Sequence, residues 1–351
     1  MSSPPRPTPP PPSPPQTGPG SIWDEPTPAW MVWGSAGLFL ALLFAWSPAY
    51  IGHLLVMFGI YMLLAYSLNL VTGFGGLIVF CQAIFYGIGA YTYALTRLRA
   101  GSPGDQAAQL LWSGAWGFLP ALLSAALVAA MIAVAIGWFC LRFRRDHFIF
   151  ATIGFQMIVF VILYNWVGLS RGPFGLYGIP RPSLLGFSLR EPWHYALLTA
   201  ALLALVLPLL FRLYHSPFGL ALQTLREDER AARAMGVNTT ALALQAFTVA
   251  GATAGLAGAL YAGYVTYIDP TSFSLRESIF LVTLLMLGGG GNIKGPLAGT
   301  AVMIALPEAL RFLGLPDDVA ANLREMLYGA LLAGLMFWRP QGLAGASSLQ
   351  R

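Results

Sequence analysis

The sequence predicts an all-α, polytopic membrane protein with about ten transmembrane or re-entrant helices. Hydrophobic residues make up 57% of the 351 residues and charged residues only 9%, whereas about a quarter of a soluble domain is charged. Long apolar runs alternate with short polar breaks, and the alternating pattern typical of barrel strands is absent. Because backbone groups in hydrocarbon must be paired within their own segment, we expect the runs to be helices.

The expected spans follow the apolar runs in order. They cover residues 30–46, 50–71, 77–98, 117–140, 147–168, 193–213, 240–265, 276–290, 297–313 and 323–338. Run 276–290 is short for a spanning helix, and glycines crowd residues 72–76. Either place could therefore be re-entrant.

The flanks of the chain differ from this single membrane domain, which we assign to residues 29–340. Residues 1–28 begin with a stretch that is half proline, and such a stretch is expected to form a disordered tail. Residues 341–351 form a second short tail. Cys81 and Cys140 both lie in apolar runs, so we interpret them as core residues, and we expect no metal site.

Lys and Arg residues between the spans predict the orientation. Placing the Ser216–Asn238 loop in the cytoplasm leaves 11 basic residues inside and 8 outside. Both termini then lie in the cytoplasm. Arg171, Arg181 and Arg190 in one external loop count against this orientation.

Ionisable groups are scarce in the expected spans, which argues against a proton- or sodium-driven carrier. Glu308, His53 and His147 stand near helix ends and are expected to be satisfied there. A P-loop is excluded because Lys294, which stands in GGGGNIKGP, is the only lysine and follows Ile293. Motifs of common hydrolases and a basic patch for nucleic acid are also absent. Any uphill transport must therefore draw its energy from another subunit.

One segment breaks the apolar pattern: SPFGLALQTLREDERAARAMGVN, Ser216–Asn238. Its spacing predicts a short helix over Leu225–Met235, begun by a capping box of Thr224 and Glu227. Glu229 and Arg233 are spaced for an i, i+4 ion pair, and Gly236 is expected to end the helix in the left-handed conformation.

The charges of this helix balance, three arginines against three acidic residues. A helix that lies on anionic lipid should instead be basic. The balanced charges leave two interpretations equally open. The helix either docks into a groove of a partner protein or is a solvent-exposed connection between two spans.

Several ordered motifs resemble the branched-chain amino acid permease family of ABC importers, the LivM type. Ala231, Ala232 and Gly236 keep the A-A-x-x-x-G spacing of the importer coupling segment, while Arg230 occupies its acidic place. Further similarity lies in GGLIVFCQAIFYGIGAYTYAL (75–95), LSRGPFGLYGIPRP (169–182), residues 250–300 and WRPQGLAG (338–345).

The resemblance implies a permease subunit of the bacterial inner membrane that has no cofactor of its own. Its partners would be a second permease of the LivH type, two cytoplasmic ATPases that use ATP and Mg, and a periplasmic substrate-binding protein. The cargo would be branched-chain or other hydrophobic amino acids. A urea or small-amide permease is the nearest alternative, and a passive channel or ion-coupled carrier is a more distant one.

Three groups of candidate residues follow. ATPase coupling is assigned to Arg226, Glu227, Glu229, Arg230, Ala231, Ala232, Arg233 and Gly236. A translocation path or hinge is assigned to two glycine segments and one amide: Gly73, Gly75, Gly76, Gln82, Gly288, Gly289, Gly290, Gly291 and Asn292. Docking of the binding protein is assigned to Arg171, Gly172, Gly175 and Gly178.

The small residues spaced four apart in GATAGLAGALYAG, from Gly251 to Gly263, have a different interpretation. Rows of this kind allow helices to pack backbone to backbone in lipid. We therefore expect tight helix packing there in preference to substrate contact.

Overall fold

Long helices lie side by side in the computed structural model, which describes residues 49–99, 117–143, 145–184, 187–188, 191–311 and short pieces between 323 and 343. The predicted all-α class is confirmed for these residues. The long helices are α2 (Ala49–Leu68), α3 (Gln82–Arg99), α5 (Phe118–Cys140), α6 (Arg145–Asn165), α8 (Pro192–Tyr214), α11 (Thr239–Val265), α12 (Leu275–Gly288) and α13 (Lys294–Arg311).

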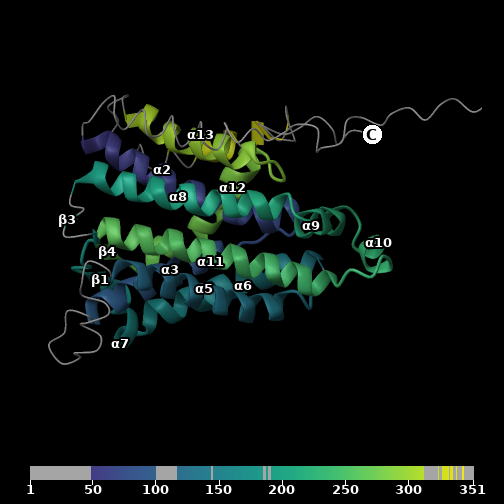
Figure 1. The fold of residues 1–351 in the computed structure, drawn as a ribbon, viewed down its shortest axis with the longest axis horizontal. Coiled ribbons are helices and arrows are strands. Elements are labelled where there is room, and N and C mark those ends of the chain that lie inside the picture. Colours follow the sequence, from purple (N-terminus) through teal and green to yellow (C-terminus); the bar gives the residue numbers. More distant parts are fainter. Residues whose placement is uncertain are drawn as a thin grey trace, which may run out of the picture.

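Short elements lie at the two ends of these helices (Figure 1). At one end lie α7 (Val167–Ser170), η2 (Gly172–Phe174) and β1 (Leu176–Tyr177), which pairs antiparallel with β4 (Tyr267–Ile268). At the other end lie α9 (Pro217–Glu227) and α10 (Glu229–Ala234). The remaining short elements are β2 (Ser183–Leu184), its partner β3 (Phe187–Ser188) and η3 (Pro270–Phe273).

Among the residues that the structure describes, five helices are long and apolar enough to cross a membrane: Tyr50–Phe74, Phe118–Cys140, His147–Asn165, Pro192–Tyr214 and Thr239–Val265. Apolar side chains point outward along α5 and α6, where Leu123 is 66% and Phe150 73% exposed, as expected for a lipid-facing surface. The predicted span 30–46 lies outside the described residues, and only scattered residues of 323–338 are described.

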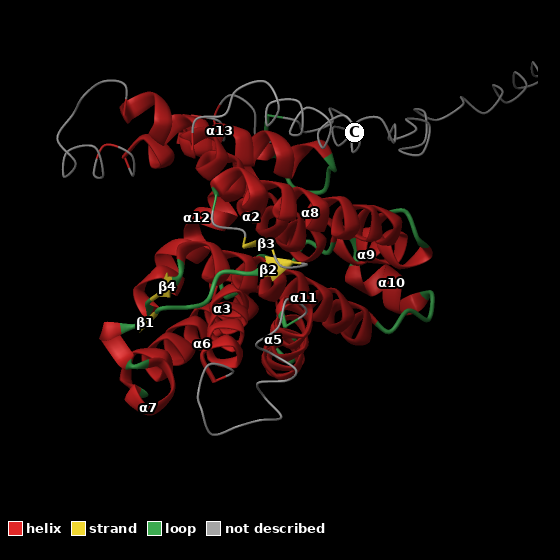
Figure 2. Ribbon diagram, turned by 60° about the vertical axis from the view of Figure 1, so that its left-hand side comes forward, coloured by secondary structure: helices red, strands yellow, loops and turns green. Residues whose placement is uncertain are grey.

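Helix α11 lies between two groups of helices. Figures 1 and 2 show α13, α2 and α8 on one side of it and α3, α5 and α6 on the other. Small residues of α11 allow its close contact with α3 and α5. A Cβ added to Gly258 would lie 2.0 Å from the carbonyl oxygen of Tyr86, and one on Gly255 would lie 2.5 Å from the Cβ of Ala129. The prediction of tight packing along this row is confirmed.

The first glycine segment departs from the predicted boundaries. Helix α2 ends at Leu68 and is followed directly by a π-helix, η1 (Asn69–Phe74). The helical segment therefore extends beyond its predicted end at residue 71. The chain is then irregular until α3 begins at Gln82, so the predicted start of a helix at residue 77 is wrong. A buried polar contact fixes this start, because the Gln82 amide donates to Ser67 Oγ at 2.7 Å.

The start of α12 is fixed in the same way. Ser278 Oγ accepts from the backbone N–H of Ala83 at 3.0 Å and lies 3.1 Å from Gln156 Oε1. The Gln156 amide donates to the carbonyl of Phe273 at 2.8 Å. These contacts satisfy irregular backbone inside the protein, which is where a membrane protein can tolerate it. At 14 residues, α12 is shorter than the about 20 residues that a full span needs.

Candidate functional site

The charged segment forms two helices, not the single predicted helix over Leu225–Met235. Helix α9 begins with Pro217 at its first turn, and α10 begins after Asp228, whose backbone is extended (φ −148°, ψ 107°). The Asp228 carboxylate caps α10 by accepting from the N–H groups of Arg230 at 2.7 Å and Ala231 at 3.2 Å. The predicted capping box is wrong, because Thr224 lies inside α9 and its hydroxyl donates to the carbonyl of Ala221 at 2.8 Å.

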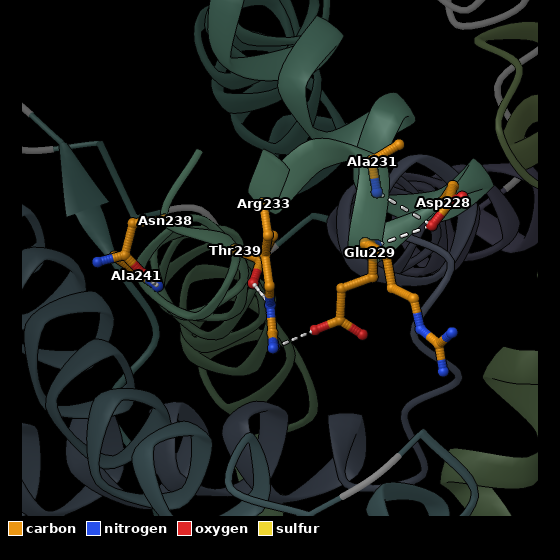
Figure 3. Close-up of polar contacts among 8 residues, drawn as sticks. Asp228, Glu229, Ala231, Arg233, Asn238, Thr239 and Ala241 are labelled. Atoms are coloured by element: carbon orange, nitrogen blue, oxygen red, sulfur yellow. Dashed lines mark hydrogen bonds and ion pairs between the residues drawn. The ribbon is translucent and has the colours of Figure 1, made fainter. Parts of the chain in front are cut away.

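Helix α10 is joined to the start of α11 through Arg233 (Figure 3). The predicted ion pair is confirmed, because Arg233 Nη2 lies 2.5 Å from Glu229 Oε1. Arg233 Nε also donates to Thr239 Oγ1 at 3.0 Å. Gly236 then takes φ +83°, so the predicted left-handed stop is confirmed as well.

Most of α10 faces outward. Glu227, Asp228, Glu229, Arg230 and Ala231 are exposed, and Met235 beyond the helix is 67% exposed. Ala232 is the exception, because it is fully buried against this chain. The exposed surface of this helix is therefore the charged face around Ala231 and Met235.

Helix α9 is anchored to the helix bundle. Leu222 and Leu225 are 0% and 5% exposed, respectively. Half-buried Arg226 turns away from the charged face, and its Nη1 donates to the carbonyl oxygen of Gly73 in η1 at 2.6 Å. Gly291 also lies beside this guanidinium, where an added Cβ would be 2.2 Å from Nη1 and 3.0 Å from the Gly73 oxygen.

The two glycine segments, far apart in sequence, lie against each other. The Asn69 side chain joins them, because its Oδ1 accepts from the N–H of Gly291 at 2.9 Å and its Nδ2 donates to the carbonyl of Asn292 at 3.1 Å. Tyr66 adds a bond from its hydroxyl to the carbonyl of Ile293 at 2.8 Å. Gly73 and the second glycine segment therefore meet next to α9, whereas Gln82 contacts Ser67 of α2.

Glycine is required at several of these positions by the backbone. Gly76, Gly289 and Gly291 have φ of +66°, +102° and +84°, respectively, a region that side chains disfavour. Gly75 closes the π-helix, and Gly288 ends α12, with Gly290 in the loop that follows. Gly342 of the C-terminal motif packs on Gly289, where an added Cβ would lie 2.5 Å from the Gly289 Cα.

At the opposite end, the four docking candidates form one loop. Arg171, Gly172, Gly175 and Gly178 all take positive φ, between +58° and +74°. Beside them Phe174 is 82% and Tyr177 64% exposed, and the Arg171 guanidinium lies 5.0 Å from the centroid of the Tyr177 ring. Exposed aromatic and Arg side chains of this kind are frequent at protein interfaces.

Glu308 and His53, two of the ionisable residues singled out near helix ends, have partners there. Glu308 accepts a hydrogen bond from Tyr50, and His53 Nδ1 lies 2.9 Å from the Tyr264 hydroxyl. Sequence reasoning missed Glu277 in the first turn of α12. Its buried carboxylate lies near Tyr61, which stands near the middle of the Tyr50–Phe74 span, and among the described residues its Oε1 has no hydrogen-bond partner. A Glu at the start of an unusually short apolar run was the available signal.

The long apolar helices, with a charged two-helix segment at one of their ends, are those of a multi-pass membrane protein. Comparison with known proteins gives the particular family, because residues 50–336 match the model of the branched-chain amino acid transport system permease component. The chain belongs to this family.

Two relatives are the high-affinity branched-chain amino acid transport system permease proteins LivM of Salmonella typhimurium and Escherichia coli. They are 34% and 33% identical to this chain, covering 81% of it and 67% of their own length. The corresponding LivH protein of Salmonella typhimurium is 24% identical over 83% of this chain and 93% of its own. No solved structure matches the chain significantly.

Family membership settles the class of function. The chain is a multi-pass permease component, a transport subunit rather than an ATPase, and ATP is used by a partner subunit. This favours an ABC permease over the passive channel or ion-coupled carrier that the sequence left open.

Proposed function

We propose that this chain is a membrane subunit of an ABC importer that moves branched-chain or other hydrophobic amino acids across a bacterial inner membrane. The observation that carries the cargo assignment is the identity of 34% and 33% to two LivM proteins over 81% of the chain. The complex would contain a second permease of the LivH type, two cytoplasmic ATPases and a periplasmic binding protein. The similarity to both a LivM and a LivH protein of one organism supports the paired permeases.

The proposed orientation puts α9 and α10 in the cytoplasm and the β1–β4 end in the periplasm. Both termini then lie in the cytoplasm. In this orientation α10 presents exposed charges of both signs to an ATPase, and the Arg171–Gly178 loop presents Phe174 and Tyr177 to the binding protein. Protein interfaces depend on a few aromatic or Arg side chains that become buried in the complex. The exposed Phe174, Tyr177 and Arg171 side chains of this loop are suited to that role.

A transport assay tests the cargo. The permease is reconstituted into proteoliposomes with its co-encoded permease and ATPases, and the co-encoded binding protein is added outside with labelled leucine, valine or urea. ATP-dependent uptake of leucine and valine, with no uptake of urea, is the expected result. Uptake of urea alone would reject the amino-acid cargo, and uptake without any ATPase would reject the ABC mechanism.

A substitution at Gly236 tests docking. Leu at φ +83° should distort the end of α10, because side chains rarely adopt this conformation. The Gly236→Leu variant should insert in the membrane normally but retain much less ATPase on co-purification. Gly178→Leu is the matched control, since Gly178 has φ +74°, has nothing within 4 Å of an added Cβ and lies at the opposite end. Equal ATPase retention by both variants would count against the docking role.

A further inference from the structure

We infer that Arg226 is a positioning residue that transmits movement of the α9–α10 segment to the two glycine segments, and is not itself a contact with the ATPase. The inference rests on the proposed coupling function. Arg226 was expected among the polar contacts to an ATPase. In the structure its guanidinium instead points into the helix bundle and donates to the Gly73 carbonyl at 2.6 Å.

The site around Arg226 is built from backbone. Gly73 supplies the acceptor oxygen, and the guanidinium also lies so close to Gly291 that an added Cβ would be 2.2 Å from Nη1. Both neighbours therefore have to be small. Arg226 occupies the point where α9, η1 and the loop after α12 meet.

The two glycine segments are also joined directly to each other. Asn69 lies one turn before Gly73 in the same π-helix and makes two hydrogen bonds across to Gly291 and Asn292. A displacement of the Arg226 guanidinium therefore acts on a unit of two segments, not on one loop. This unit leads toward α3 through Gln82 and into α13 through Lys294.

Arg233, which bonds to the next helix along the chain, takes a different route. Arg233 connects α10 to α11 through Thr239 at 3.0 Å, whereas Arg226 connects α9 to η1 at 2.6 Å. Movement of the docking helix can therefore reach the bundle at two places. The Arg233 connection closes the short turn at Gly236, whereas the Arg226 connection reaches the two glycine segments, where Gly289 and Gly291 have positive φ.

The bond also suits an arginine. A guanidinium is always charged and holds its donors in a fixed plane, so it keeps a set direction toward a carbonyl. A charge-assisted bond of this kind is stronger than a neutral one. Leu222 and Leu225, buried on the same helix, hold α9 in place beneath it, so that α9 and its arginine move together.

The test separates docking, ATP hydrolysis and uptake in the reconstituted complex. The Arg226→Ala variant should retain ATPase on co-purification and should still hydrolyse ATP. Its uptake per ATP should fall roughly tenfold or more, because a hydrogen bond from a charged group is lost. Arg226→Lys keeps one charged donor and should restore part of the uptake. Gly236→Leu should show the opposite pattern, with loss of co-purified ATPase.

Three results would overturn the inference. Wild-type uptake per ATP in Arg226→Ala would show that the bond transmits nothing. Loss of co-purified ATPase in a folded Arg226→Ala permease would make Arg226 a docking contact. If Arg226→Ala does not fold, Arg226→Lys is measured alone, and uptake per ATP equal to that of the wild type would reject the role. Failure of the wild-type complex to take up any cargo would instead reject the proposed function.

Discussion

Helices α9 and α10 are neighbours in one charged segment, yet their side chains have different surroundings. In α10 the side chains of the Glu229–Arg233 pair are 49% and 61% exposed, respectively, and the charged face is open. In α9 Leu225 is 5% exposed and Arg226 bonds to η1 at 2.6 Å. Asp228 separates the two helices. This difference is the basis of the proposal that α10 contacts the ATPase and that α9 transmits its movement.

The largest effect is expected where the α9 connection meets the second glycine segment. An Ala at Gly291 would place its Cβ 2.2 Å from Arg226 Nη1, at φ +84°. Displacement of the guanidinium together with backbone strain of about 1–3 kcal/mol should abolish most uptake without loss of bound ATPase. Gly154→Ala in α6 is the control, since nothing lies within 4 Å of its added Cβ. Equal uptake by the two variants would contradict the role of the Arg226–glycine contact in transmitting movement through α9.

A second pair of variants compares the anchoring of the two helices. Leu225→Ala removes a buried side chain and should lower the unfolding free energy of the isolated permease by about 2–5 kcal/mol. Met235→Ala, at a side chain that is 67% exposed, should change it by less than about 0.5 kcal/mol. Thermal unfolding in detergent without ATPase subunits measures both. A similar loss in the two variants would show that α10 is anchored as firmly as α9.

The boundary between the helices gives a smaller effect. Asp228→Ala removes the cap of α10 and should destabilise that helix by about 0.5–2 kcal/mol. Hydrogen exchange of the amides from Arg230 to Ala234 should become faster, while exchange in α9 stays the same. Thr224→Ala should leave α10 unchanged because its hydroxyl bonds within α9. Faster exchange in α10 with Thr224→Ala would instead support the capping box that the sequence predicted for Thr224 and Glu227.

The smallest effect belongs to the exposed ion pair. Glu229→Gln should change the stability of the permease by no more than about 0.5 kcal/mol, because water and salt screen exposed pairs. Unfolding midpoints at low and high salt measure this difference. A shift comparable to that of Leu225→Ala would show that the pair holds α10 to the bundle.

Composition and local signals predicted the all-α class, several spans and the stop at Gly236, because these depend on neighbouring residues. The division at Asp228 was missed although two local signals were present. Pro217 is typical of the first turn of a helix, and Asp is a preferred cap. The capping box at Thr224 competed with them in the sequence, but Thr224 lies inside α9 and its hydroxyl bonds to the carbonyl of Ala221.

Contacts across the fold could not be predicted in this way. Asn69 and Gly291 are separated by 222 positions, and Arg226 and Gly73 by 153. Glycine density marked both segments as irregular, but nothing in either segment shows that they meet. The same limit applies to Glu277 and Tyr61, which lie on different helices.

Replacement of α10 tests the docking role most directly. Glu229–Ala234 is exchanged for a Gly-Ser linker of equal length, and ATP-driven leucine uptake is measured in proteoliposomes that contain the other subunits. We predict a permease that folds and inserts normally but neither retains ATPase nor supports uptake. Uptake at the wild-type rate by this variant would contradict the role of α10 as the site through which ATP hydrolysis drives transport.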